Sequence, residues 1–203
     1  MFELQNIRTQ IEKCTLCQIH SSKNKTVPGE GNLTPEIMII GEAPGKNEDL
    51  QGKPFVGAAG KILDQLLSSI KLSRDQVFIT NMIKCRPPNN RDPLDQEIDN
   101  CANFLNEQIH FLKPKMIVTL GRYSFSKFLP DRLISHDRGK LFKWKNVFIY
   151  PVYHPAAALR NSSIKIKLEE DFLGIIKSLK KIKSNPNTKQ KNKYKENEQL
   201  SSL

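Results

Sequence analysis

Four short apolar runs recur along the chain, and each is bounded by turn-forming residues. They are rich in β-branched side chains and lack polar alternation, which is typical of strands covered on both faces. The runs lie at 36–40, 77–80, 116–120 and 147–152. Between them, apolar residues return at helical spacing, over 2–13, 61–70, 92–112, 122–129 and 163–181. This alternation predicts an α/β protein with three layers, α/β/α, around a central, mostly parallel sheet of four strands.

Two local signals refine these expectations. Asp92 followed by Pro93 predicts a helix N-cap with proline at the first helical position. The first fourteen residues carry acids and no continuous apolar stretch, so we expect no export signal. No apolar run approaches the roughly 18 residues that a membrane span requires, so we expect no membrane association.

The charge is concentrated at the C-terminal end. The 203 residues carry a net charge of +11, which favours a polyanionic partner. Residues 177–203 contain eight Lys and two Glu with few apolar side chains, too few to offset the entropy of ordering. We therefore expect one catalytic domain over 1–176, then the end of the last helix and a basic, disordered tail over 177–203. The tail is either a loose phosphate-binding arm or a solubilising segment.

The four cysteines suggest one site with four thiolates. Cys14 and Cys17 form a C-x2-C pair, Cys85 follows the second predicted strand, and Cys101 occupies the inward stripe of a helix. Without an export signal, such a set favours a metal site over disulfides. The spacing alone leaves zinc and an iron–sulfur cluster equally open.

A glycine-rich stretch follows the first predicted strand, GEAPGKNED at 41–49 and GKPFVGAAG at 52–60. It is not a phosphate-binding loop of an NTPase, because three residues instead of four separate its glycines and no Ser or Thr follows the Lys. We expect its amides to approach a planar ligand closely, with a helix beginning near Gly57.

Four segments taken together resemble the family 4 uracil-DNA glycosylases, the iron–sulfur branch of that superfamily. They are GEAPGKNED, GKPFVGAAGKILDQLL, TNMIKCRPPNNRDP and YHPAAALR, with the cysteines at these positions. The resemblance runs from about Ile7 to Phe172. It implies that uracil is flipped out of DNA and its N-glycosidic bond hydrolysed, leaving an abasic site without a nick. It also implies a 4Fe-4S cluster on the four cysteines, with zinc as the remaining alternative.

By this resemblance, uracil binds to a set of residues from all four segments: Gly41, Ala43, Phe55, Asn81 and His154. The Asn81 side chain would accept from N3–H and donate to O4, whereas cytosine presents the reverse polarity at both positions. Phe55 would stack on the base. His154, with backbone amides from Gly41 to Ala43, would stabilise negative charge at O2.

The catalytic carboxylate is expected to be Glu48, with Glu42 as the second candidate, acting mainly through its backbone. Relatives with a GQDP-type motif carry Asp where this chain has Ala43, so the carboxylate must come from another position. Among the DNA contacts, Leu159 would wedge into the gap left by the flipped base and Arg160 would bind phosphate. Further phosphate contacts are expected from Arg86, Arg91 and Arg138.

These features predict a monomeric enzyme in the cytoplasm, at the nucleoid of a prokaryote-like cell, acting on uracil in single- or double-stranded DNA. Two alternatives remain open. One is a non-catalytic iron–sulfur or zinc protein that binds nucleic acid on the same fold. The other is a glycosylase of wider range that also removes hypoxanthine or oxidised pyrimidines.

Overall fold

The computed structural model describes residues 2–184. Most of the predicted tail, residues 185–203, lies outside the described part of the chain. No helix within 2–184 is long and apolar enough to cross a membrane.

A single six-stranded sheet forms the centre of the fold, in the order β1-β3-β2-β4-β6-β5. Its four inner strands are parallel and match the four predicted runs: β2 (Ile37–Gly41), β3 (Phe78–Asn81), β4 (Met116–Leu120) and β6 (Val147–Val152). Two antiparallel edge strands were not predicted, β1 (Glu30–Gly31) and β5 (Phe142–Trp144). They are only two and three residues long and half-exposed, so they carry no apolar run that a sequence pattern could reveal.

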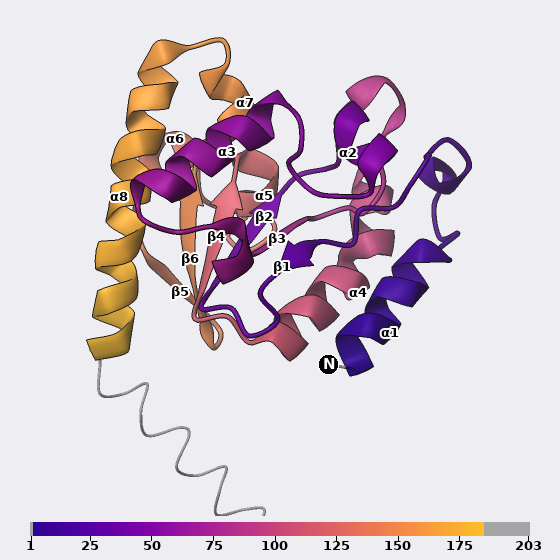
Figure 1. The fold of residues 1–203 in the computed structure, drawn as a ribbon, viewed down its shortest axis with the longest axis horizontal. Helices are drawn as coiled ribbons and strands as arrows, with labels where there is room; N and C mark the ends of the chain where they lie inside the picture. The colour runs from indigo at the N-terminus through magenta and orange to yellow at the C-terminus, as the bar shows by residue number, and fades with distance from the viewer. Residues whose placement is uncertain (1, 185–203) are drawn as a thin grey trace, which may run out of the picture.

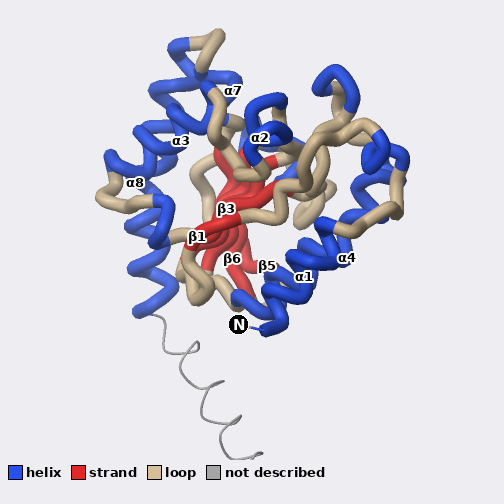
Figure 2. Tube along the Cα trace, turned by 45° about the vertical axis from the view of Figure 1, so that its right-hand side comes forward, coloured by secondary structure: helices blue, strands red, loops and turns tan. Residues whose placement is uncertain are grey.

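Helices cover both faces of this sheet, as predicted (Figures 1 and 2). On one face, α3 (Ala58–Ser69) and α8 (Ser162–Ser184) pack with the side chains of Ile37 and Ile39 of β2. On the other face, α4 (Asp95–Leu112) and α5 (Arg122–Ser126) pack with Met38 and Ile40 of the same strand. Alternate residues of β2 therefore enter two separate cores, which explains why the strand is apolar throughout.

The remaining helices are short or lie at the periphery. α1 (Phe2–Glu12) packs on α4 through the buried Ile7 and Ile11. Three short α-helices and three 3-10 turns were not predicted: α2 (Lys46–Gln51), α6 (Ile134–Asp137), α7 (Pro155–Ala158), η1 (Gln18–Ser21), η2 (Arg74–Gln76) and η3 (Pro88–Asn90).

The predicted cap at Asp92 is wrong. Helix α4 begins at Asp95, and the Glu97 carboxylate satisfies its first turn by accepting from the Leu94 amide at 2.9 Å. The Asp92 carboxylate instead accepts hydrogen bonds from Arg122 at 3.2 Å and from the Tyr123 hydroxyl, both on α5. A tertiary contact has thus taken the side chain that the local pattern assigned to capping.

Candidate functional site

The predicted base-binding residues meet where the parallel strands end. Gly41 is the last residue of β2, Asn81 is the last of β3, and His154 lies two residues beyond β6. Ala43 follows in the loop between β2 and α2. In open sheets of this kind, ligands bind at the carboxyl ends of the strands. This edge is therefore the candidate site.

Gly41 allows two side chains to share one small space. A Cβ atom at Gly41 would lie 2.3 Å from Asn81 Oδ1 and 2.6 Å from Phe55 Cζ, closer than real side chains approach. Asn81 and Phe55 are both buried, with 1% and 6% of their surface exposed. Any larger residue at position 41 would displace one of them.

The Asn81 side chain carries an unpaired acceptor. Its Oδ1 atom is buried and has no hydrogen-bond partner among residues 2–184. A buried polar atom without a partner costs about 1–3 kcal/mol, so native proteins seldom keep one without a reason. Asn81 Oδ1 lies beside the Phe55 ring, so it could accept a hydrogen bond from an N–H group of a flat molecule stacked against that ring.

The backbone of Asn81, in contrast, is firmly held by a residue that sequence reasoning missed. The Lys84 ammonium group, on a residue only 1% exposed, donates to Asn81 O and Thr80 Oγ1 at 2.7 Å each and to Gln108 Oε1 at 2.8 Å. Lysines are rarely buried, so only the place of Lys84 between Asn81 and Cys85 could have signalled this role.

Glu48 is fixed by the start of helix α3. Its Oε1 atom accepts from the amides of Val56 and Gly57, each at 2.8 Å. Gly57 is the N-cap of α3, which confirms the predicted helix start near this residue. Its amide is one of the donors that a helix start leaves without an intrahelical partner. The second oxygen, Oε2, faces Gly45, where a Cβ atom would lie 2.7 Å away. The carboxylate is thus held in one orientation by backbone alone.

His154 lies beside Glu48 and Phe55. Its ring centroid is 5.8 Å from that of Phe55. Burial lowers the pKa of His154 to about 4, and the negative charge of Glu48 opposes this shift only in part. His154 Nδ1 accepts from the Ala156 amide at 3.1 Å, as the N-cap of α7, which places the proton of the neutral ring on Nε2. The imidazole is therefore a neutral N–H donor at physiological pH.

Glu42 faces a different set of charges. Burial and the nearby Asp92 raise the pKa of Glu42 to about 7, and Arg122 opposes the shift. The negative charge of Glu48, in contrast, acts directly on His154. Of the two predicted carboxylates, Glu48 is therefore the one placed beside a base-binding residue.

The predicted DNA contacts lie at two places around the site. Leu159, just after α7, is an exposed apolar side chain with 51% of its surface accessible, and Arg160 beside it is also exposed. Arg86 follows β3, and its Nε donates to Asn90 Oδ1 at 2.7 Å.

Two of the predicted phosphate contacts already form ion pairs with carboxylates of the same chain. Arg91 binds Glu97 with both guanidinium branches, at 2.6 and 2.8 Å, and Arg138 binds the buried Asp171. These arginines lie where a phosphate would have to compete with a carboxylate already in place.

The four cysteines line one cavity, and all four are free thiols. They come from the segment after α1 (Cys14), the start of η1 (Cys17), the segment after β3 (Cys85) and helix α4 (Cys101). Burial and the negative charges of the other three thiolates raise the pKa of Cys85 to about 12. Together as thiolates, the four sulfurs would need a bound cation to offset their charges.

The chemistry of the cavity's side chains bears on which group they could hold. Among the residues that the structure describes, no three or more His, Cys, Asp or Glu side chains are placed to hold one metal ion. Iron–sulfur clusters are held by cysteine thiolates, commonly four of them. The donor set, four cysteines and no histidine around an otherwise mainly apolar cavity, suits such a cluster.

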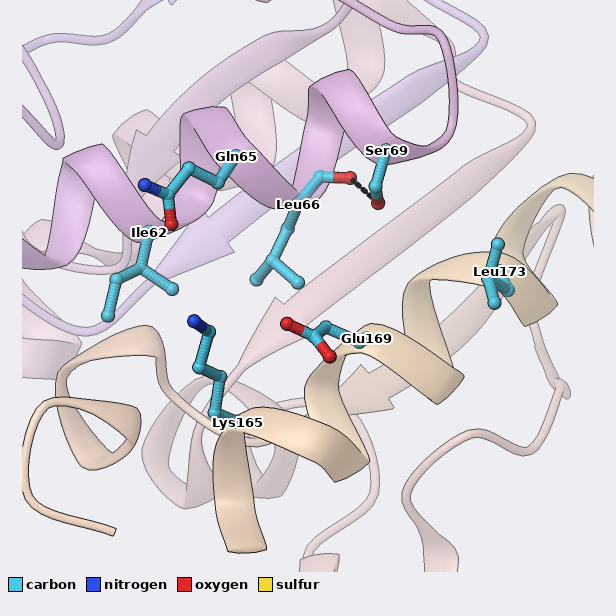
Figure 3. A pocket seen from close by; sticks show the side chains of 7 residues that line it. All are labelled: Ile62, Gln65, Leu66, Ser69, Lys165, Glu169 and Leu173. Atoms are coloured by element: carbon cyan, nitrogen blue, oxygen red, sulfur yellow. Dashed lines mark hydrogen bonds between the residues drawn. The ribbon is translucent and has the colours of Figure 1, made fainter. Parts of the chain in front are cut away.

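A second cavity, of about 250 Å³, lies away from this edge, between α3 and α8 (Figure 3). Side chains of both helices line it: Ile62, Gln65, Leu66, Ser69, Lys165, Glu169 and Leu173. It contains none of the predicted site residues.

Comparisons with known proteins show the family to which the chain belongs. The family model "Uracil DNA glycosylase superfamily" matches residues 28–180. A relative named "Type-4 uracil-DNA glycosylase" from Sulfurisphaera tokodaii is 48% identical, over 85% of this chain and 83% of its own. Another of the same name, from Saccharolobus solfataricus, is 47% identical over 88% of each chain. A third, from Archaeoglobus fulgidus, is 45% identical over 85% of this chain and 91% of its own. The chain therefore belongs to the uracil-DNA glycosylase superfamily and, within it, to the type-4 uracil-DNA glycosylases.

Proposed function

We propose that this chain removes uracil from DNA with the residues at the carboxyl edge of its sheet, leaving an abasic site. The observation that carries the proposal is the buried, unpaired Oδ1 of Asn81 beside the Phe55 ring. Uracil supplies what is missing there, an N3–H donor on a flat ring. The shared activity of the relatives supports an enzyme and does not favour the non-catalytic binding protein.

Recognition follows from the polarity of the Asn81 amide. Its Oδ1 accepts from N3–H of uracil while its NH2 group donates to O4, and Phe55 stacks on the ring. Cytosine would place an acceptor against Oδ1 and a donor against the NH2 group. The mismatch leaves buried polar groups unpaired, at about 1–3 kcal/mol each.

Bond breaking is assisted on both sides of the sugar–base bond. As the C1′–N1 bond breaks, its electron pair moves onto the uracil ring, mainly to O2. The neutral His154 donates from Nε2 to this developing charge. The Glu48 carboxylate orients the water that bonds to C1′ and takes its proton, with Oε1 held by two amides.

The four cysteines would hold a 4Fe-4S cluster, with zinc as the alternative that metal and sulfide analysis distinguishes. Four thiolate ligands leave no open coordination position, so the bound group would supply a rigid cross-link instead of chemistry on the base. The cross-link would join the N-terminal segment, the end of β3 and helix α4, and so brace the strand that carries Asn81.

We further propose that the enzyme acts as a monomer on uracil in single- or double-stranded DNA, at the nucleoid. The proposed mechanism needs no second copy, since residues of one chain supply each group that it uses. Leu159 and Arg160 would contact the strand beside the flipped nucleotide.

The cluster is expected to matter more for stability than for the chemistry of the pocket. Replacing Cys85 or Cys101 with serine should remove a ligand and lower the free energy of unfolding by at least about 3 kcal/mol, or roughly 10 °C in Tm. Thermal unfolding and the visible absorbance of anaerobically purified protein measure this. Normal stability with a selective loss of excision would contradict a bracing role.

The excision rate is expected to be nearly constant between about pH 6 and pH 8, because His154 acts in its neutral form and its pKa is about 4. Single-turnover rates should be measured in wild-type protein and in Glu42→Gln. The Glu42→Gln variant removes a carboxyl group whose pKa is about 7 and which could titrate in the same pH range. A rate that falls as the pH rises through about 6.5 in both proteins would mean that protonated His154 is the active form.

The proposed activity is tested on an oligonucleotide with a single uracil, using protein purified without oxygen. Strand cleavage at the uracil only after alkali treatment is the expected result, with no cleavage of matched cytosine or thymine oligonucleotides. No cleavage by cluster-loaded protein would contradict the proposal. A panel with hypoxanthine and oxidised pyrimidines determines whether the substrate range is wider.

A further inference from the structure

Phe55 lies in a strained piece of backbone. It sits between α2 and α3, outside any helix or strand, with φ at +52°. This left-handed conformation is uncommon for a bulky side chain and persists only where the surroundings enforce it. The position of the Phe55 ring in the pocket therefore depends on the contacts that hold this loop.

Two features hold the loop from behind. One is Gly60, where a Cβ atom would lie 1.8 Å from Phe55 O, so the first turn of α3 presses directly on the Phe55 backbone. The other is Arg74, whose Nη1 donates to Phe55 O at 3.1 Å and whose Nη2 donates to Pro54 O. The planar guanidinium group thus binds two successive carbonyls, a geometry that arginine provides and lysine does not.

Arg74 is itself anchored on two other elements. It lies in η2, just before β3, and its guanidinium group pairs with Asp64 of α3 and Glu30 of β1, each at 3.0 Å. The side chain is about one quarter exposed, so part of this network is shielded from solvent. The Phe55 loop is therefore tied through one side chain to the edge of the sheet and to α3.

We propose that Arg74 is a positioning residue that holds Phe55 at stacking height for the flipped base. This inference rests on the proposed function, because it assigns Arg74 a role through Phe55. Arg74 touches backbone carbonyls and carboxylates, and its effect reaches the substrate through the ring. Stacking acts on bound base and transition state alike, so loss of Arg74 should weaken substrate binding more than it slows the chemical step.

The test is a double-mutant cycle between Arg74→Gln and Phe55→Ala, measured as KM and kcat on the single-uracil oligonucleotide. Arg74→Gln should raise KM, and the inhibition constant for free uracil, about tenfold in the wild-type background. It should change both less than twofold in the Phe55→Ala background. Arg74→Lys should give an intermediate value, because one amine cannot bind both carbonyls.

Lys115→Gln is the matched control for loss of one positive charge. Lys115 pairs with Glu36 at the opposite end of the strands, and its replacement should leave KM unchanged. All variants are compared at a temperature where circular dichroism shows each to be folded. Equal losses from Arg74→Gln in both backgrounds would overturn the proposal, because a purely structural effect is additive.

Hydrogen exchange gives a second measure that needs no activity. In Arg74→Gln, the amides of Lys53, Phe55, Val56 and Gly57 should exchange faster while those of β4 stay unchanged. Unchanged exchange in the loop would overturn the positioning role even in an active enzyme. If the wild-type chain excises no uracil but Arg74→Gln still speeds exchange in the loop, the proposed function is contradicted while the anchoring by Arg74 stands.

Discussion

Replacing Asn81 with alanine is expected to lower the rate of uracil excision by about a thousandfold. The variant loses both hydrogen bonds to the base edge, and charge develops on that base in the transition state, so the loss exceeds that of one neutral hydrogen bond. Single-turnover kinetics on the single-uracil oligonucleotide measure it. The affinity for undamaged duplex should be unchanged, because Asn81 is buried and acts only on the flipped base.

The same variant should be at least as stable as the wild type. Asn81 Oδ1 has no partner in the described part of the chain, so its removal relieves a buried, unsatisfied acceptor. Asn103→Ala is the matched control, since Asn103 is an exposed residue of α4 bonded to Glu107. A marked fall in Tm with only a small loss of excision would show that Asn81 is structural and that the base is recognised elsewhere.

Glu48→Gln is expected to slow excision by about a hundredfold to a thousandfold, because glutamine cannot take a proton from the attacking water. Its amide oxygen can still accept from the Val56 and Gly57 amides, so the loop should keep its structure. Single-turnover rates at saturating enzyme measure the chemical step.

Glu42→Gln makes the comparison specific, because both variants remove one carboxylate from the same stretch of chain. It should change the rate less than threefold, since Glu42 lies among Asp92 and Arg122 and carries a pKa of about 7. If Glu42→Gln were the slower variant, the roles of the two carboxylates would have to be exchanged.

Most of the sheet could be predicted from sequence because its four inner strands bury both faces. A run such as 116–120 has one polar side chain, that of Thr119, and does not alternate between polar and apolar residues; the structure buries all five residues. The two edge strands are half-exposed, so they need no apolar run that the sequence would reveal. The prediction that Asp92 caps a helix is wrong because Tyr123 and Arg122 donate to its carboxylate instead. Both misses come from tertiary contacts, which a local pattern does not contain.

The residues of the site also divide into those that the sequence predicts and those that only the folded structure reveals. Gly41, Asn81 and His154 could be placed together because each follows a predicted parallel strand. Arg74 and Lys84 could not, because their roles depend on carbonyl groups brought close by folding. Sequence alone assigns such residues to the surface, where arginine and lysine are usually found.

The most direct test of the account is a crystal structure of the cluster-loaded enzyme with uracil bound. We expect uracil N3 within hydrogen-bond distance, about 3 Å, of Asn81 Oδ1, with the ring stacked on Phe55 and O2 facing His154 Nε2. Uracil bound with its N3 edge away from Asn81, or in the cavity between α3 and α8, would contradict the central claim that the unpaired Asn81 oxygen recognises the base.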